Sequence, residues 1–206
     1  KFNEDEKIKY SINIKSNDKI IFFTNDGKLY TLNPNILPSG KSKGNNFSLY
    51  VNLKSSSKIV GLAKHIKNTN YLIVSKKAKG FIFKLNDDPK IQKNGKQIFN
   101  LKKDDVVVKV VSDLKQYLAV VNSINKLLIF KTQEIPILIK SGGVLLQKIK
   151  NGSLTDVQTL EKNEGLKWKI GNQIRHEEDI KYWIGKRAQV GKKVPKRFNK
   201  DMKFSI

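Results

Sequence analysis

The fold of this chain is decided by one stretch, Ile20-Ile21-Phe22-Phe23-Thr24-Asn25-Asp26-Gly27-Lys28-Leu29-Tyr30-Thr31-Leu32. Two apolar runs of strand length, 20–23 and 29–32, flank a polar turn that contains Asp26-Gly27. β-Branched and aromatic residues favour strands, and Asp-Gly supplies the positive backbone angle that a tight turn needs. The stretch therefore predicts a β-hairpin.

This hairpin pattern returns twice further along the chain. Residues 71–83 and 117–130 each hold two apolar runs around a polar turn, and their first runs begin 51 and 46 residues after the preceding ones. A third run follows each hairpin and ends 48 residues after its predecessor, over 47–53, 97–101 and 145–149. A fourth run closes each unit, over 58–62, 106–111 and 155–160. Four strands in a repeat of about 40–50 residues are typical of propeller-like arrays.

The period predicts an all-β fold, with repeated four-stranded blades in a single domain over 1–206. Complete repeats are expected at 18–66, 70–112 and 116–160, with a partial blade built from 1–17 and 165–176. Residues 8–14 alternate apolar and polar side chains, which is typical of a half-buried strand. A β-sandwich with evenly spaced strands is the alternative interpretation.

The C-terminal stretch 177–206 is interpreted as a basic helical tail. A short helix is predicted over 177–189, because Ile180, Trp183 and Ile184 would share one helical face. From position 181 onward the tail carries nine Lys and Arg residues against a single acid. We expect a flexible segment that adds positive charge without fixing a path for a partner.

The net charge is the strongest compositional signal. The chain has 41 Lys and Arg residues against 18 Asp and Glu, a net charge of +23. Such a charge repels itself and favours a polyanionic partner, of which nucleic acid is the first candidate. A drift of the whole proteome toward Lys is one alternative, although drift would be expected to add acids as well. A membrane surface is a weaker alternative, because no amphipathic helix with a basic face can be drawn.

Composition also limits the cellular setting. The chain has no Cys, so disulfides, thiolate metal sites and Cys nucleophiles are excluded. It contains neither an apolar run long enough to span a membrane nor a secretory leader, so a soluble, cytoplasmic protein is expected. The first residue is not Met, and the chain is expected to be part of a longer protein.

The candidate contacts to nucleic acid are basic residues of the turns, the loops and the C-terminal part. They are Lys28, Lys76, Lys77, Lys79 and Lys126 in the hairpin turns, Lys41, Lys43, Lys93, Lys96 and Lys140 in the loops, and Lys148, Lys186, Arg187, Lys192 and Lys193 further on. Equivalent turns of successive repeats emerge on one side of an array, so the turn lysines are predicted to line one rim. Lys binds phosphate as a point charge, and only three residues are Arg, which favours contact with the DNA backbone over base recognition. Solvated linkers are the alternative interpretation of the loops.

No catalytic, metal or cofactor site is predicted. Ser39-Gly40-Lys41-Ser42 resembles the end of a phosphate-binding P-loop, but Asn35 occupies the position of the first Gly and strand residues follow instead of a helix. His65 and His176 are isolated in the sequence. The acids Glu177-Glu178-Asp179 are better explained by the start of the predicted helix than by a metal site.

Several motifs taken together resemble the C-terminal domain of the A subunit of bacterial DNA topoisomerase IV, in its alphaproteobacterial form. They are the hairpin 19–30, Leu37-Pro38-Ser39-Gly40, Gly95-Lys96-Gln97, Gly143-Val144-Leu145-Leu146-Gln147-Lys148, Trp183-Ile184-Gly185-Lys186-Arg187-Ala188-Gln189 and Pro195-Lys196. The resemblance implies a β-pinwheel, a broken propeller that binds and bends duplex DNA. It also implies as partners the rest of the A subunit and, through it, the ATPase B subunit, in the bacterial nucleoid. Magnesium and ATP would serve other parts of that enzyme and not this domain.

The related domain of the DNA gyrase A subunit carries a Gln-Arg-Arg-Gly-Gly-Lys-Gly box, which this chain lacks. Its nearest counterparts, Gly40-Lys41-Ser42-Lys43-Gly44 and Ser141-Gly142-Gly143, have no paired Arg. Wrapping of the gyrase kind is therefore the less favoured alternative. A protein-interaction module would be favoured if basic residues were spread over both faces, and an enzyme would need titratable residues converging at the centre of the array.

Overall fold

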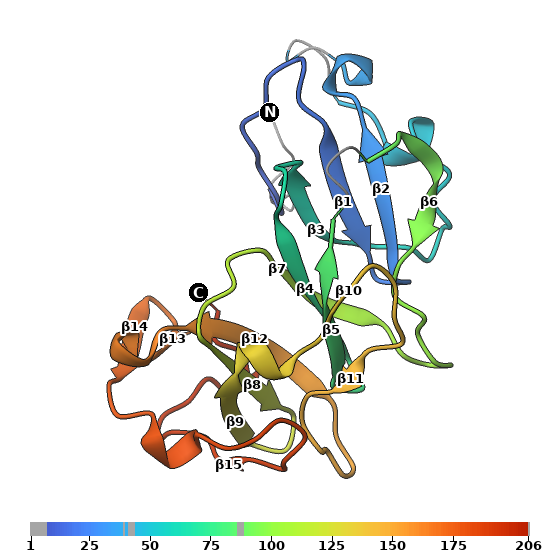
Figure 1. Cartoon of the computed structure of the whole chain (residues 1–206). Helices are drawn as coiled ribbons and strands as arrows, with labels where there is room; N and C mark the ends of the chain where they lie inside the picture. The colour runs from blue at the N-terminus through green and yellow to red at the C-terminus, as the bar shows by residue number, and fades with distance from the viewer. Residues whose placement is uncertain (1–7, 39, 41–43, 86–88, 206) are drawn as a thin grey trace.

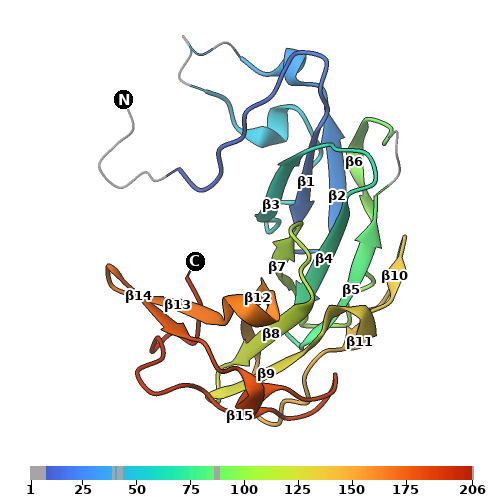
Figure 2. The same cartoon turned by 60° about the vertical axis from the view of Figure 1, so that its left-hand side comes forward.

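Three curved sheets stacked side by side, with a hairpin at one end, form the molecule (Figures 1 and 2). This computed structural model describes residues 8–38, 40, 44–85 and 89–205. The all-β fold predicted from the repeats is confirmed. Within those residues the helical segments are single 3₁₀ turns, namely η1 (Pro34–Ile36), η2 (Phe47–Leu49), η3 (Thr132–Glu134), η4 (Lys162–Glu164) and η5 (Lys181–Trp183). None of the helices in this part of the chain is long and apolar enough to cross a membrane.

Each sheet is a blade built around one of the predicted hairpins. From its inner to its outer edge, blade 1 is β3 (Ile59–Lys64), β1 (Ile20–Thr24), β2 (Lys28–Leu32) and β6 (Gln92–Gln97). Blade 2 is β7 (Val107–Val111), β4 (Asn70–Ser75) and β5 (Lys79–Lys84), with β10 (Ile137–Leu138) and β11 (Val144–Leu145) both on the edge of β5. Blade 3 is β12 (Leu154–Leu160), β8 (Tyr117–Asn122), β9 (Lys126–Lys131) and β15 (Lys192–Lys193). The separate terminal hairpin is β13 (Leu166–Ile170) with β14 (Gln173–Glu177).

The outer strand of each blade comes from the chain that follows the next hairpin. β6 completes blade 1 although it follows β5 of blade 2, and β10 and β11 complete blade 2 although they follow β9 of blade 3. Each predicted repeat therefore supplies three strands of its own blade, and the second and third repeats also donate the outer strands of the preceding blade. The apolar runs 97–101 and 145–149 begin at the last residue of β6 and of β11, which explains their equivalent places in the sequence.

A glycine with a positive φ angle accompanies each exchanged strand. Gly95, Gly143 and Gly191 have φ angles of 67°, 72° and 84° and lie 48 residues apart. At Gly95 any other residue would be disfavoured for two reasons. The positive φ angle would strain its backbone, and its Cβ would lie 2.6 Å from the ring of Tyr30. These positions let the chain turn closely onto the outer edge of the blade.

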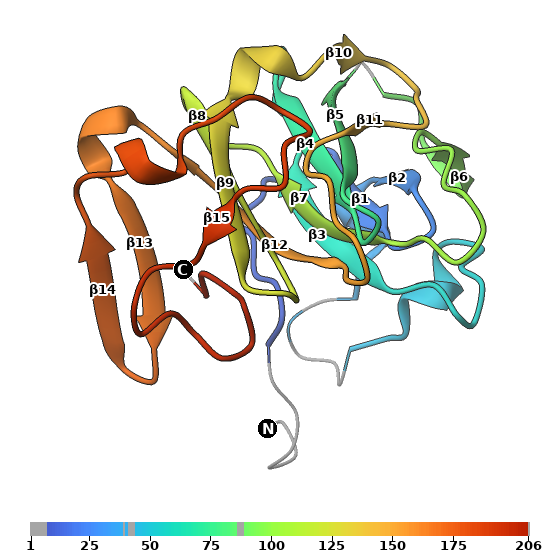
Figure 3. The same ribbon diagram turned by 90° about the horizontal axis from the view of Figure 1, so that it is seen from below.

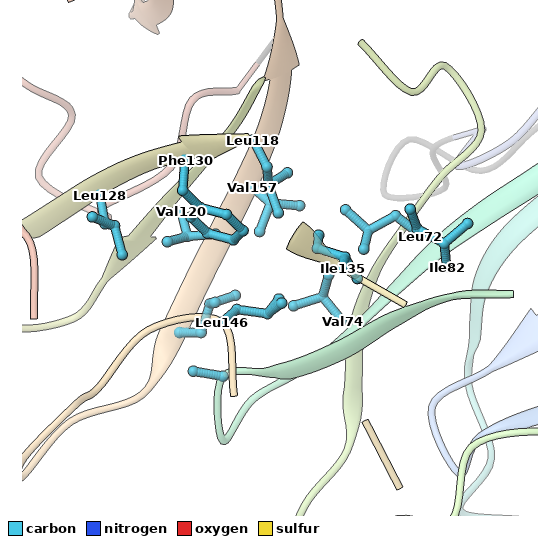
Figure 4. Close-up of a cluster of buried hydrophobic side chains, with 12 residues drawn as sticks. Leu72, Val74, Ile82, Leu118, Val120, Leu128, Phe130, Ile135, Leu146 and Val157 are labelled. Atoms are coloured by element: carbon cyan, nitrogen blue, oxygen red, sulfur yellow. The ribbon is translucent and has the colours of Figure 1, made fainter. Parts of the chain in front are cut away.

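Apolar side chains of neighbouring blades pack face to face. Between blades 1 and 2, the rings of Phe23 and Tyr71 lie 5.1 Å apart. Between blades 2 and 3, Leu72 and Val74 face Leu118 and Phe130, and Leu146 belongs to the same cluster (Figure 4). Because these contacts continue from sheet to sheet, the blades form one stack.

The two end faces of the stack are covered by segments outside the blades. Ile12 and Ile14 pack on blade 1 together with Phe47 and Val51. Residues 9–14 alternate exposed and half-buried side chains as predicted, but Ile8 is exposed and the segment forms no strand. The run 47–53 is also not a strand, because Asn46 caps the 3₁₀ turn η2 through the backbone N–H of Ser48.

The C-terminal segment covers the free face of blade 3. Trp183, Phe198 and Phe204 are buried there against the terminal hairpin. The prediction of a helix over 177–189 is wrong. β14 extends to Glu177, and the only helical segment within 177–189 is the single turn η5. The expected flexible tail is likewise packed. The segments 1–17 and 165–176, expected to share a partial blade, have their described residues packed at opposite ends of the stack (Figure 2).

Candidate nucleic-acid interface

The exchanged strands lie along the convex outer edge of the stack, and β3, β7 and β12 lie along the concave inner edge (Figures 1 and 2). Viewed from below, β6 and β10 lie at the outside of the molecule, and β11 and β15 face the viewer (Figure 3). A partner that binds along the outer edge would therefore contact residues from all three blades.

The outer edge of blade 1 is basic. Lys28 begins β2 and lies opposite Gln97 of β6, and Leu29 lies opposite Lys96. The Lys28 Nζ donates a hydrogen bond to the Asn94 backbone oxygen at 3.2 Å, which holds its ammonium beside β6. The side chains of Lys93 and Lys96 are exposed. Three of the predicted residues, Lys28, Lys93 and Lys96, are thus brought together.

Blade 3 aligns two lysines directly opposite each other. In the β9–β15 pair, Lys126 lies opposite Lys193 and Leu127 lies opposite Lys192. The Lys192 ammonium lies 4.3 Å from the centre of the Tyr182 ring. Like charges directly opposite each other destabilise an antiparallel pair, so this arrangement favours a polyanion that neutralises both.

The outer edge of blade 2 carries no lysine on its exchanged strands β10 and β11. Lys140, Lys148 and Lys186 are exposed beside it, and Lys79 lies opposite Leu145. Arg187 is engaged in the fold, since its Nε donates to the Glu134 oxygen at 3.0 Å and its Nη1 to the Leu145 oxygen at 2.8 Å. We assign Arg187 a structural role, because it joins the segment before β15 to η3 and β11.

Hydrogen bonds join the exchanged segments of the three blades into one band. The backbone N–H of Asn100 donates to the Ser141 oxygen at 2.7 Å, and that of Ala188 donates to the Leu146 oxygen at 2.8 Å. The amide of Gln147 donates to the Val190 oxygen at 2.9 Å. We call residues 92–100, 137–148 and 186–193 the outer belt. Sequence reasoning missed that Gln147 links two of these segments, although it belongs to a motif that carries the family resemblance.

The hairpin turns occupy equivalent places closer to the inner strands. Lys76 in the turn of blade 2 donates its backbone N–H to Val106, just before β7, and accepts from Leu154 of β12. The Lys77 Nζ donates to the Lys103 oxygen at 2.7 Å. Lys76 and Lys77 are exposed but lie outside the outer belt. Lys41 and Lys43 lie outside the described residues, as do the other residues of the P-loop-like motif except Gly40.

Acidic residues neutralise lysines on the inner edge. Ion pairs join Lys64 to Asp18 at 2.9 Å, Lys109 to Asp156 at 2.8 Å and Lys115 to Glu164 at 2.8 Å. The Lys115 ammonium holds the pKa of Glu164 below its usual value, and Glu164 raises the pKa of Lys115. In the part of the chain that the structure describes, no lysine of the outer belt forms an ion pair.

The acidic and His side chains of the described residues are not gathered into a metal site. They form no group of three or more arranged to bind a metal ion. The His176 Nε2 lies 2.7 Å from the Glu164 backbone oxygen, in the terminal hairpin. The exposed lysines of the outer edge can bind polyanions.

Comparison with known proteins relates this chain to topoisomerase subunits. The family described as DNA gyrase C-terminal domain, beta-propeller, matches residues 18–65 and 69–112. The DNA topoisomerase 4 A subunit of Rickettsia felis is 31% identical over 205 residues, which cover 100% of this chain and 28% of that protein. The chain is thus related to the DNA gyrase C-terminal domain family and to the A subunits of DNA topoisomerase 4. The resemblance found in the sequence motifs is confirmed.

Other relatives of this C-terminal domain agree. The DNA topoisomerase 4 A subunit of Caulobacter vibrioides is 29% identical over 207 residues, covering 99% of the chain and 27% of that protein. The solved E. coli ParC C-terminal domain superimposes with a TM-score of 0.82 at 20% identity, covering 96% of this chain and 85% of that one. This likeness supports the pinwheel fold. The chain spans a little over a quarter of the length of its curated relatives.

Proposed function

We propose that this domain binds duplex DNA along the outer belt with little sequence preference and bends it. The observation that carries the proposal is the opposed pair Lys126 and Lys193, on an edge whose described lysines form no ion pair. Lysines contact phosphate oxygens without reading bases, and each contact releases counterions from the duplex. A sequence-tolerant complex follows.

Bending follows from the shape of the belt. Basic side chains at both ends of a convex path, on blades 1 and 3, attract a duplex to a curved surface. Bending a site of about 20–30 base pairs costs of order 1–6 kcal/mol, and contacts spread along the curve offset that cost. The curved belt therefore provides both the attraction and the shape for a bend.

Within the longer protein, the domain would present DNA segments for strand passage, decatenation and relaxation by topoisomerase IV. Its partners would be duplex DNA, the remainder of the A subunit and, through it, the ATPase B subunit, and not a membrane. The domain itself would use no cofactor, and magnesium and ATP would act in other parts of the enzyme. A cytoplasmic, nucleoid-associated location accompanies this role.

The test is binding of this 206-residue chain to linear, relaxed and supercoiled DNA over a series of salt concentrations. We expect a log–log slope of about −0.9 per neutralised phosphate, so about five contacts give about −4.5. Charge reversal of four exposed belt lysines, K93E/K96E/K192E/K193E, should lower affinity at least about a hundredfold and flatten the slope. The control K67E/K162E reverses two exposed lysines outside the belt.

Two results would contradict the proposal. A flat salt response of the unaltered chain would exclude phosphate contacts. Loss of binding in K76E/K77E while the fourfold belt variant binds normally would move the DNA from the belt to the rim of hairpin turns. Energy transfer between the labelled ends of a duplex measures the bend in the same samples.

A further inference from the structure

An apolar ridge interrupts the basic outer belt at its middle. Ile137, Leu138 and Ile139 are consecutive and 55%, 38% and 61% exposed, and Leu145 beside them is 37% exposed. Three consecutive exposed apolar residues reduce solubility and are retained where they serve a contact. We call these four residues the apolar ridge.

The ridge is held firmly on the edge of blade 2. Ile137 and Leu138 pair with Ile82 and Phe83 of β5, and Leu145 pairs with Lys79 at the other end of the same strand. The backbone N–H of Ile82 donates to the Pro136 oxygen at 3.0 Å, just before the ridge. A contact made by these side chains would therefore cost little ordering of the backbone.

The ridge is continuous with the basic strands on both sides. Ser141 donates its backbone N–H to the Ile98 oxygen at 3.0 Å, next to β6, and Arg187 donates to the Leu145 oxygen at 2.8 Å, before β15. Exposed Lys140 and Lys148 flank it. Blades 1 and 3 present lysines at the corresponding exchanged strands, whereas blade 2 presents Ile and Leu.

We propose that the apolar ridge contacts a groove of the bound duplex at the middle of the bend. This inference rests on the proposed function. A duplex held by its phosphates on blades 1 and 3 passes over the ridge, where deoxyribose carbons and thymine methyl groups offer apolar surface. The surrounding positive charge favours DNA over an apolar protein partner at this place. The ridge removes water from the inner side of the curve and fixes the position of the bend.

Apolar contacts have a different thermodynamic signature from phosphate contacts. They release no counterions, so they leave the salt dependence of binding unchanged. Burial of apolar surface makes the heat-capacity change of binding more negative. The ridge and the lysines are therefore separable by measurement.

The test compares I137S/I139S with the control I66S in calorimetric titrations of a linear duplex. Ile66 is 57% exposed in the loop between β3 and β4. We expect the ridge variant to bind about threefold to tenfold more weakly, with an unchanged salt slope, a less negative heat-capacity change and a smaller bend. The single variant I139S, at the most exposed ridge position, should show a smaller loss in the same direction, and melting curves check that each variant is folded.

The outcomes separate this inference from the proposed function. Failure of the unaltered chain to bind DNA overturns the proposed function. Normal binding with equal affinities, bends and heat-capacity changes for I137S/I139S and I66S overturns the ridge contact alone. A changed salt slope in the ridge variant would also overturn it. Altered self-association with unchanged DNA binding would instead identify the ridge as a protein-docking surface.

Discussion

The lysines of the two edges of the stack differ in their partners. On the inner edge, Lys64, Lys109 and Lys115 each lie within 2.9 Å of a carboxylate oxygen. On the outer edge, Lys126 lies opposite Lys193. Paired charges support the fold, whereas opposed like charges weaken it until a polyanion binds. Under the proposed function, the inner edge serves stability and the outer edge serves binding, a division in which function costs some stability.

The largest effect on stability is expected at Asp156 of the inner edge. Its Oδ1 accepts from the Lys109 Nζ at 2.8 Å and the Val157 N–H at 2.9 Å, and its Oδ2 accepts from the Phe204 N–H at 2.9 Å. This buried carboxylate thus joins β7, β12 and the C-terminal segment. D156A should lower the free energy of unfolding by about 2–3 kcal/mol, measured by urea denaturation.

Two further variants sharpen this prediction. D156N retains an acceptor oxygen but loses the charge, so it should cost less than D156A. D113A removes a carboxylate that is exposed on the same edge and serves as the control. DNA affinity should stay unchanged in all three at temperatures where they are folded. Lost affinity in folded D156A would contradict the division between the edges.

A smaller effect of opposite sign is expected on the outer edge. K193Q removes the repulsion between Lys126 and Lys193, so the free energy of unfolding should rise by about 0.2–1 kcal/mol. DNA affinity should fall severalfold, with a salt slope closer to zero by about 0.9, because one phosphate contact is lost. Denaturation and binding measured on the same protein check both signs. A variant that is less stable and binds normally would reverse the assignment of the edge.

The smallest effect is the acid sensitivity of the inner edge. The pKa of Glu164 is held below its usual value, first by the hydrogen bond from Lys115 and then by its bond to the backbone N–H of Glu161. A depressed folded pKa adds stability that is present above the unfolded pKa of about 4.3 and is lost as the pH falls through the folded value. E164Q should therefore depend less on pH below about 4.3 than the unaltered chain in denaturation curves. Equal slopes in that range would show that the pair contributes nothing.

The hairpins could be predicted from the sequence because their signals are local. The apolar runs 20–23 and 29–32 flank an Asp-Gly turn, and similar apolar runs flank a polar turn within 71–83 and within 117–130. The strand exchange could not be predicted, because β6 joins β2 across about 60 residues and both neighbours of β6 in the chain are loops. The period showed that the third runs were equivalent but not which blade they joined.

The predicted helix failed because its apolar spacing had another cause. Trp183 is buried against blade 3 from the single 3₁₀ turn η5, and Ile180 is buried there from the residue just before that turn. The Trp183 indole donates a hydrogen bond to the Lys193 backbone oxygen at 2.7 Å, which ties η5 to β15. Tertiary packing thus produced a spacing that resembles helical periodicity. Of the candidate binding residues, the lysines of blades 1 and 3 are brought together at the outer belt, while Arg187 proved to be engaged in the fold.

Strand exchange also limits how a gene for such an array can change in length. Deletion of a segment that runs from one position of a blade to the equivalent position of the next removes one receiving edge together with one donated strand, as between Gly95 and Gly143, so the remaining blades stay complete. A deletion that removes a donated strand without its receiving edge leaves that edge open, and open edges pair with other chains. Blade number in arrays of this kind can therefore change in whole steps through unequal recombination, and the curvature of the surface changes with it.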